Sequence, residues 1–129
     1  MILRLSQLIG DASRPALSES WLDVFEPATG ARYAMCPDGD GDDVEAAVAA
    51  AQAAFPAWSS LPGDQRGRWL QRLADALETR IDDFAAAESR DAGKPLALAR
   101  DIEIPRAVAN LRFFASAAMQ FASESHHGQ

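Results

Sequence analysis

The residues that could carry covalent chemistry are few in this chain. Its one cysteine, Cys36, lies in a strand-like run with neither a histidine nor a basic cluster near it in the sequence. A cysteine reacts as its thiolate, and nothing in this run favours ionisation of the thiol. The two histidines, His126 and His127, are adjacent in the polar stretch SESHHGQ. We therefore interpret Cys36 as a half-buried apolar residue and the histidines as part of a solvated tail.

Paired carboxylates occur as Asp42–Asp43 and as Asp82–Asp83. Both pairs lie where a helix is expected to begin, and negative charge near a helix N-terminus is stabilised by the helix dipole. The sequence contains no P-loop, no G-x-G-x-x-G motif and no H-E-x-x-H motif. The residues by themselves therefore indicate no active site.

The pair Pro105–Arg106 raises a further chemical question. It places a helix-disrupting ring and a charge in an otherwise apolar helical pattern. Pro105 fits the first turn of a new helix after a short break, because the first N–H groups of a helix have no partner within it. Arg106 then has two interpretations, which the residues leave open. It is a surface charge paired with Glu103 or Asp101, or it contacts a substrate.

The elements that position these residues begin with a β-hairpin. Residues 21–36 predict one strand around Leu22 and Val24 and a second strand from Tyr33 to Cys36. The connection runs from Pro27 to Gly30, where proline presets φ and glycine accepts the positive φ of a tight turn. The stretch RLSQLIG before the hairpin predicts a further strand.

Three helices are expected after the hairpin. The first begins at a capping box that starts with Asp42, and it ends at Pro56. The apolar stripe of the second continues to about Arg90. The third and longest runs from near Pro95 to about Glu124.

This order predicts an α+β fold, with a β-hairpin region over residues 1–36 and a helical region over residues 42–125. Two strands are marginal by themselves, and this hairpin is too small to cover three helices. The chain is therefore expected to pack on a larger body.

Composition excludes several classes of function. The net charge of −7 disfavours binding to nucleic acid, because an acidic surface repels phosphates. The longest apolar stretch, AAVAAAQAAF, is much shorter than the roughly 20 residues that span a bilayer. A single cysteine cannot form an intramolecular disulfide, and the first residues do not form a signal peptide. We predict a cytoplasmic protein with no nucleic-acid or membrane partner.

Five stretches stand in a fixed order along the chain: EPATG, DDVEAAVAAAQAAFPAWSSLP, RGRWLQRLADALE, ESRDAGKP and EIPRAVANLRFFA. Together they resemble the opening of NAD(P)-dependent aldehyde dehydrogenases, from about Leu22 to Ser123. Three segments, AAFPAWSS, AESRDAGKPLALAR and IPRAVANLRFFAS, are most similar to the branch that oxidises 2-aminomuconic or 2-hydroxymuconic semialdehyde in aromatic-ring catabolism.

The resemblance implies that residues 1–129 are an incomplete N-terminal portion of a cofactor-binding domain. In that family the catalytic cysteine, the general-base glutamate and the nucleotide-binding residues lie downstream of the matched portion. No catalytic or cofactor-binding residue is therefore expected in this chain, which is predicted to be inactive alone. NAD or NADP is expected to bind the full-length protein only. The implied partners are the remainder of the chain and further copies in a homo-oligomer.

The resemblance also implies two sets of site residues. Arg106 matches a position at the mouth of the substrate tunnel, where an arginine would bind the remote carboxylate of a muconic semialdehyde, and Ile102 would line the same tunnel. Asp91 and the backbone carbonyl of Phe25 match positions that hold a monovalent cation in many members. Oxygen ligands suit such a hard cation. Where the family commonly has Asn-Pro, this chain has Glu26-Pro27.

Two further hypotheses compete with a truncated aldehyde dehydrogenase. One is a short, non-catalytic helical interaction module derived from that family, and the other is a small α-rich binding protein. A truncated segment should leave an apolar face without a partner, around Phe113, Phe114 and Phe121. A module that stands alone should instead close its own core.

Overall fold

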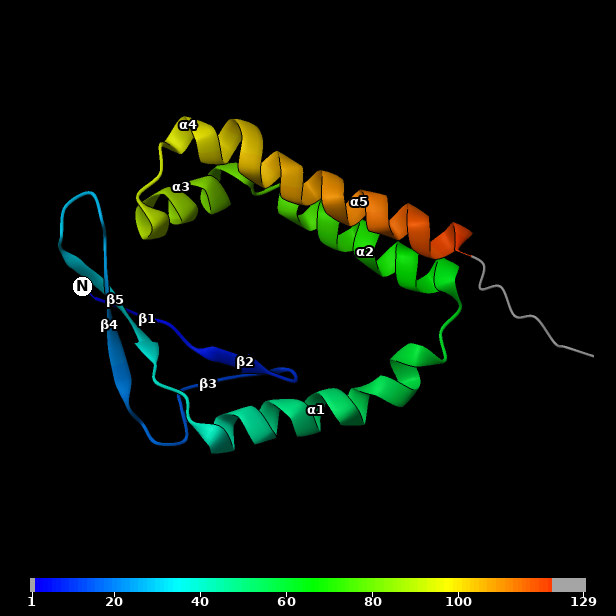
Figure 1. Cartoon of the computed structure of the whole chain (residues 1–129), viewed down its shortest axis with the longest axis horizontal. Helices are drawn as coiled ribbons and strands as arrows, with labels where there is room; N and C mark the ends of the chain where they lie inside the picture. Colours follow the sequence, from blue (N-terminus) through cyan, green and yellow to red (C-terminus); the bar gives the residue numbers. More distant parts are fainter. Residues whose placement is uncertain (1, 122–129) are drawn as a thin grey trace, which may run out of the picture. The chain divides into compact units, whose positions relative to one another are not determined.

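The computed structural model describes residues 2–121 (Figure 1). The predictions for His126, for His127 and for the end of the last helix near Glu124 lie outside the described residues. The chain forms two compact units, which are described separately. The strand unit comprises Met1–Ser59 and Ala87–Pro95, and the helical unit comprises Ser60–Ala86 and the residues from Leu96 onward.

The strand unit is built on a small mixed sheet. Its elements are β1 (Leu3–Arg4), β2 (Gln7–Ile9), β3 (Ala12–Arg14), β4 (Trp21–Phe25), β5 (Arg32–Pro37) and α1 (Gly41–Ser59). The sheet has the order β1-β5-β4, in which β1 runs parallel to β5 and β4 runs antiparallel to it. The predicted hairpin of residues 21–36 is therefore confirmed as β4 and β5.

The turn of this hairpin has the predicted chemistry. Gly30 adopts a φ of +68°, and its N–H donates to the carbonyl of Glu26 over 2.8 Å. The single strand predicted within RLSQLIG is instead two short strands, β2 and the end of β1. The structure adds β3, which pairs antiparallel with β2.

The capping box of α1 lies two residues earlier than predicted. The carboxylate of Asp40, and not that of Asp42, accepts hydrogen bonds from the N–H groups of Asp42 and Asp43 over 3.0 and 3.4 Å. In return, the carboxylate of Asp43 accepts the N–H of Asp40 over 3.3 Å. The helix starts at Gly41, so Asp40 is the residue just before it, and its side chain caps the N–H groups of the first turn. The helix also continues past Pro56 to Ser59, so the predicted end at Pro56 is wrong.

The helical part of the chain contains more breaks than the apolar stripe suggested. Its elements are α2 (Gly63–Glu78), α3 (Ile81–Ala92), α4 (Leu96–Leu98), the π-helical turn η1 (Ala99–Glu103) and α5 (Ile104–Gln120). The second predicted helix is two helices, separated at Thr79 and Arg80. The apolar period continues across the break, which is why the sequence pattern did not reveal it.

Pro105 lies in the first turn of α5, as expected. It is preceded by the π-helical turn and not by the predicted break, since the N–H of Ile104 donates to the carbonyl of Ala99, five residues earlier. A π-turn of this kind accommodates one extra residue without ending the helical path.

In the helical unit, α5 packs along α2 (Figure 1). Two glycines of α2 permit the close approach. A Cβ at Gly63 would lie 2.3 Å from the carbonyl oxygen of Ala118, and one at Gly67 would lie 2.7 Å from that of Ala115. The buried hydrophobic residues of the described chain are small: Ala16, Ala34, Ala74, Ala85, Ala99, Val108 and Ala115.

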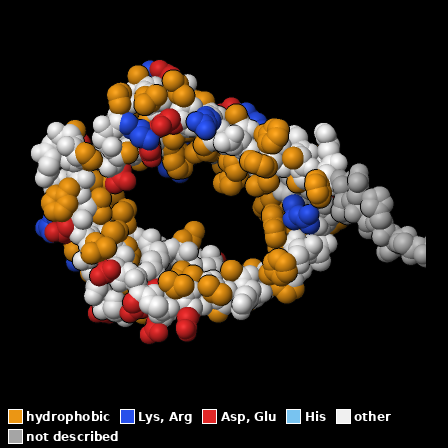
Figure 2. Space-filling view, viewed as in Figure 1, with side chains coloured by type: hydrophobic (Ala, Val, Ile, Leu, Met, Phe, Trp, Pro, Cys, Tyr) orange, Lys and Arg blue, Asp and Glu red, His pale blue; other side chains and the backbone are white. Residues whose placement is uncertain are grey.

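Large apolar side chains remain at the surface. Figure 2 shows hydrophobic side chains along the α2–α5 pair and along α1. Phe113, Phe114 and Phe121 are 66%, 60% and 83% exposed, which confirms the predicted apolar face. The fold class is confirmed as α+β, with strands followed by helices and a long last helix.

Candidate functional site

Arg106 lies on the outer side of α5. Val108 and Ala115 mark the buried side, because both are nearly inaccessible and Ala115 lies against Gly67 of α2. At 100° per residue, Arg106 is almost opposite Val108. The side chain of Arg106 is exposed and forms no ion pair within residues 2–121. The alternative pairing of Arg106 with Glu103 or Asp101 is therefore not found there, and Asp101 instead binds Arg100 over 2.8 Å.

Two exposed apolar residues share this outer side with Arg106. Ile102 lies four residues before it, in the π-helical turn, and is 57% exposed. Phe113 lies seven residues after it, and two helical turns place Phe113 on the same side of α5. An exposed guanidinium without an ion pair thus lies on a side of the helix that also carries exposed apolar residues, where a carboxylate could bind it with two parallel hydrogen bonds.

A second group of charged residues joins the β4–β5 hairpin to the end of α3, within the strand unit. We call Glu26, Tyr33, Arg90 and Asp91 the Arg90 cluster. The hydroxyl of Tyr33 donates to the carboxylate of Asp91 over 2.7 Å. The guanidinium carbon of Arg90 lies 4.3 Å from the centre of the Tyr33 ring, and its Nε lies 3.7 Å from a carboxylate oxygen of Glu26.

The electrostatics of this cluster follow from these contacts. The hydrogen bond to Asp91 raises the pKa of Tyr33 above its usual value, because it stabilises the protonated hydroxyl. Burial and the negative charges of Asp91 and Glu26 raise this pKa further, while the charge of Arg90 lowers it. Tyr33 therefore stays neutral in the physiological range and acts as a hydrogen-bond donor.

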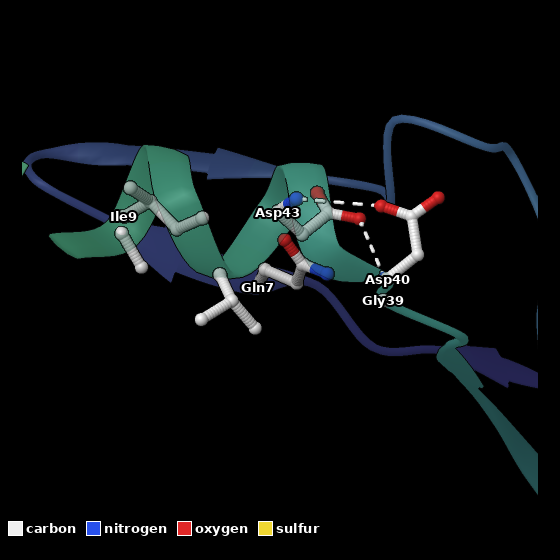
Figure 3. A pocket seen from close by; sticks show the side chains of 7 residues that line it. Gln7, Ile9, Gly39, Asp40 and Asp43 are labelled. Carbon is white, nitrogen blue, oxygen red and sulfur yellow. Dashed lines mark hydrogen bonds between the residues drawn. The ribbon is translucent and has the colours of Figure 1, made fainter. Parts of the chain in front are cut away.

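A cavity of about 270 Å³ lies beside the start of α1, lined in part by Gln7, Ile9 and Gly39 (Figure 3). Asp43 is 4% exposed, and its carboxylate accepts the N–H of Leu17 over 3.1 and 3.2 Å as well as that of Asp40. The dashed lines in Figure 3 mark the reciprocal bonds between Asp40 and Asp43. These bonds occupy the carboxylates in structural roles, so the cavity holds no acid–base pair.

The other candidates add no catalytic site. Cys36 is half-buried in β5 and forms no disulfide. No group of three or more His, Cys, Asp or Glu side chains could hold a metal ion in the described part of the chain. Among residues 2–121, no helix is both long enough and apolar enough to span a membrane.

Sequence reasoning missed the roles of Tyr33 and Arg90. The family resemblance implies a cation at Asp91 and the carbonyl of Phe25, but the hydrogen-bond partner of Asp91 in the structure is Tyr33, 58 residues away. No local pattern indicates such a contact, because it depends on how the hairpin packs against α3. The cation at Asp91 and Phe25 stays a prediction.

Comparison with known proteins gives concordant results. A sequence profile of the aldehyde dehydrogenase family matches residues 14–128. The chain is 47% identical over 123 residues to 2-aminomuconic semialdehyde dehydrogenase of Bos taurus, covering 95% of this chain and 25% of that protein. It is 36% identical over 100 residues to 5-carboxymethyl-2-hydroxymuconate semialdehyde dehydrogenase of Escherichia coli, covering 78% and 21%.

The fold is also shared with solved structures. The crystal structure of PnpE in complex with nicotinamide adenine dinucleotide matches with a TM-score of 0.91 and 32% identity, over 100% of this chain and 26% of that one. The chain thus spans about a quarter of the length of the relatives that it matches.

Proposed function

The chain belongs to the aldehyde dehydrogenase family, and on that premise we propose that it forms the N-terminal segment of a semialdehyde dehydrogenase. The whole enzyme would oxidise an aldehyde that carries a remote carboxylate to the corresponding acid, with NAD or NADP as oxidant. The names of the relatives support this substrate class, since those of Bos taurus and Escherichia coli are muconic semialdehyde dehydrogenases.

The observation that carries the proposal is the guanidinium of Arg106, which has no ion pair within residues 2–121 and lies on a surface that includes the exposed Ile102 and Phe113. A guanidinium in such a surface, once covered by the rest of the enzyme, would bind a carboxylate strongly because few water molecules would compete. Arg106 would then orient the substrate, and Ile102 would contact its carbon chain.

The chemical steps are assigned to the remainder of the enzyme. The bound nicotinamide cofactor supplies hydride acceptance, and the residues that bind it are expected outside this chain. Residues 1–129 would be an incomplete part of the cofactor-binding domain. Their contribution would be to bind and position the substrate through Arg106. The segment alone would be inactive, and the enzyme would be a cytoplasmic homo-oligomer.

The test compares two aldehydes in the full-length enzyme. Arg106→Ala should lower kcat/KM about 10- to 100-fold for a carboxylated semialdehyde, the cost of one hydrogen-bonded ion pair, and spare a neutral aldehyde of similar length. Arg100→Ala is the matched control, because Arg100 is also exposed and its one ion pair among residues 2–121 is with Asp101. An equal loss on both aldehydes in Arg106→Ala would contradict the substrate-binding role.

A competing proposal is a short, non-catalytic interaction module. The exposed phenylalanines of α5 argue against it, because a module that stands alone should cover such side chains. The intact mass of the native protein, detected with an antibody against this segment, separates the two. A species several times heavier than 13.9 kDa supports the enzyme, and one of 13.9 kDa supports the module.

A further inference from the structure

Negative charge gathers where the β4–β5 hairpin meets the C-terminal end of α3. Asp91 lies in the last turn of this helix, where the carbonyl groups already give the helix end a partial negative charge. Glu26 adds a second carboxylate from the start of the hairpin turn, and the Thr29 hydroxyl holds it there over 3.3 Å. A positive charge near both carboxylates would offset their mutual repulsion.

The backbone fixes this close approach. Gly93, just after α3, has a φ of +71°, and a Cβ at this position would lie only 2.8 Å from Cβ of Pro27 in the hairpin turn. The N–H of Gly93 donates to the carbonyl of Ser89 over 3.0 Å. The end of α3 is therefore held against the turn that carries Glu26.

The predicted inorganic cation fits this arrangement poorly. One carboxylate oxygen of Asp91, the predicted ligand, already accepts the Tyr33 hydroxyl over 2.7 Å. A positive charge is also present, because the guanidinium of Arg90 stacks 4.3 Å from the Tyr33 ring centre and lies beside Glu26. A second cation would be repelled by this guanidinium.

We propose that the guanidinium of Arg90 takes the place of an inorganic cation where the β4–β5 hairpin meets the end of α3. This guanidinium binds the face of Tyr33 and the carboxylate of Glu26, while the Tyr33 hydroxyl binds Asp91. The hairpin therefore stays packed on the end of α3 without sodium or potassium. A cation–π contact and an exposed ion pair are each modest, but both join the same two elements.

The experiment measures hydrogen exchange of backbone amides in the full-length protein. Peptides covering residues 24–35 and 87–95 are followed in sodium, potassium and tetramethylammonium chloride at equal ionic strength. We expect the wild type to exchange equally in the three salts, and Arg90→Gln to exchange about three- to tenfold faster in both peptides.

Two variants sharpen the interpretation. Arg80→Gln is the matched control, because Arg80 also stacks on an aromatic ring, that of Phe84, and pairs with Asp83, but all three belong to one stretch of chain. It should leave both peptides unchanged. Arg90→Lys retains the positive charge and should exchange less than threefold faster than the wild type.

Three results would overturn the proposal. One is a wild-type exchange rate that is lower in sodium or potassium than in tetramethylammonium, together with an Asp91→Asn rate that is the same in all three salts. This pair of results would indicate a bound inorganic ion. Another is an unchanged rate in Arg90→Gln. The third is an Arg90→Lys rate as high as that of Arg90→Gln, which would show that the positive charge is not the stabilising property.

Discussion

Two arginines on α5 have opposite surroundings, although only six residues separate them. Arg112 faces α2, where its guanidinium binds Glu78 over 2.6 Å and Asp75 over 3.0 Å. Arg106 faces outward and has no ion pair within residues 2–121. The hydrogen bonds of Arg112 therefore join two helices. The guanidinium of Arg106 remains available to a ligand. Both residues are arginines, so their different roles follow from the side of α5 on which each one lies.

The largest stability effect is expected where the inner side of α5 touches α2. Gly67→Ala would place a Cβ 2.7 Å from the Ala115 carbonyl oxygen and force the helices apart. We expect a loss of about 1–3 kcal/mol in the free energy of unfolding, measured by denaturant titration. Gly41→Ala is the control, because no atom lies within 4 Å of a Cβ there. Equal stability of the two variants would contradict the close packing of α2 and α5.

A smaller effect tests the two arginines against each other. Arg112→Ala should lower the melting temperature, because it leaves Asp75 and Glu78 close together without their shared cation. It should leave the preference for carboxylated over neutral aldehydes unchanged. Arg106→Ala should do the reverse, with a lost preference and an unchanged melting temperature. If both variants lost the preference, the division between an inner and an outer side of α5 would be wrong.

The smallest effect is a pH dependence of the inner ion pair. The hydrogen bond from Arg112 lowers the pKa of Glu78 below its usual value, and the arginine charge lowers it further. A carboxyl group with a lowered folded-state pKa stabilises the fold above its unfolded pKa, and this contribution is lost as the pH falls through the folded value. The difference in melting temperature between wild type and Arg112→Ala should therefore shrink on acidification. A difference that stayed constant below the normal carboxyl range would exclude this linkage.

Most of the fold could be predicted because its signals are local. The proline and glycine of the hairpin turn, the alternation of Leu22 and Val24, and the apolar period of the helices each depend on neighbouring residues. The errors occur where two local signals compete. Three aspartates lie close together at the start of α1, and each could cap its N-terminus. In the structure, Asp40 is the capping residue. The apolar stripe hid the break at Thr79, since a continuous period does not require a continuous helix.

The candidate sites were less predictable. Arg106 stood out because a charge beside a proline interrupts an apolar pattern, and the family resemblance suggested its role. That it lies opposite Val108 and is unpaired became evident only from the packing of α5 on α2. Tyr33 carried no signal at all, being one aromatic residue in a strand.

The sequence by itself determined that a hairpin precedes a series of helices, and it determined the family, because turn chemistry, apolar periodicity and ordered motifs depend on neighbouring residues. Only the tertiary structure decided which charges meet. Tyr33 reaches Asp91 across 58 residues, and Arg112 reaches Glu78 across 34. A hydrogen bond depends on ångström-scale distances in space, and the path of the whole chain between two residues sets those distances.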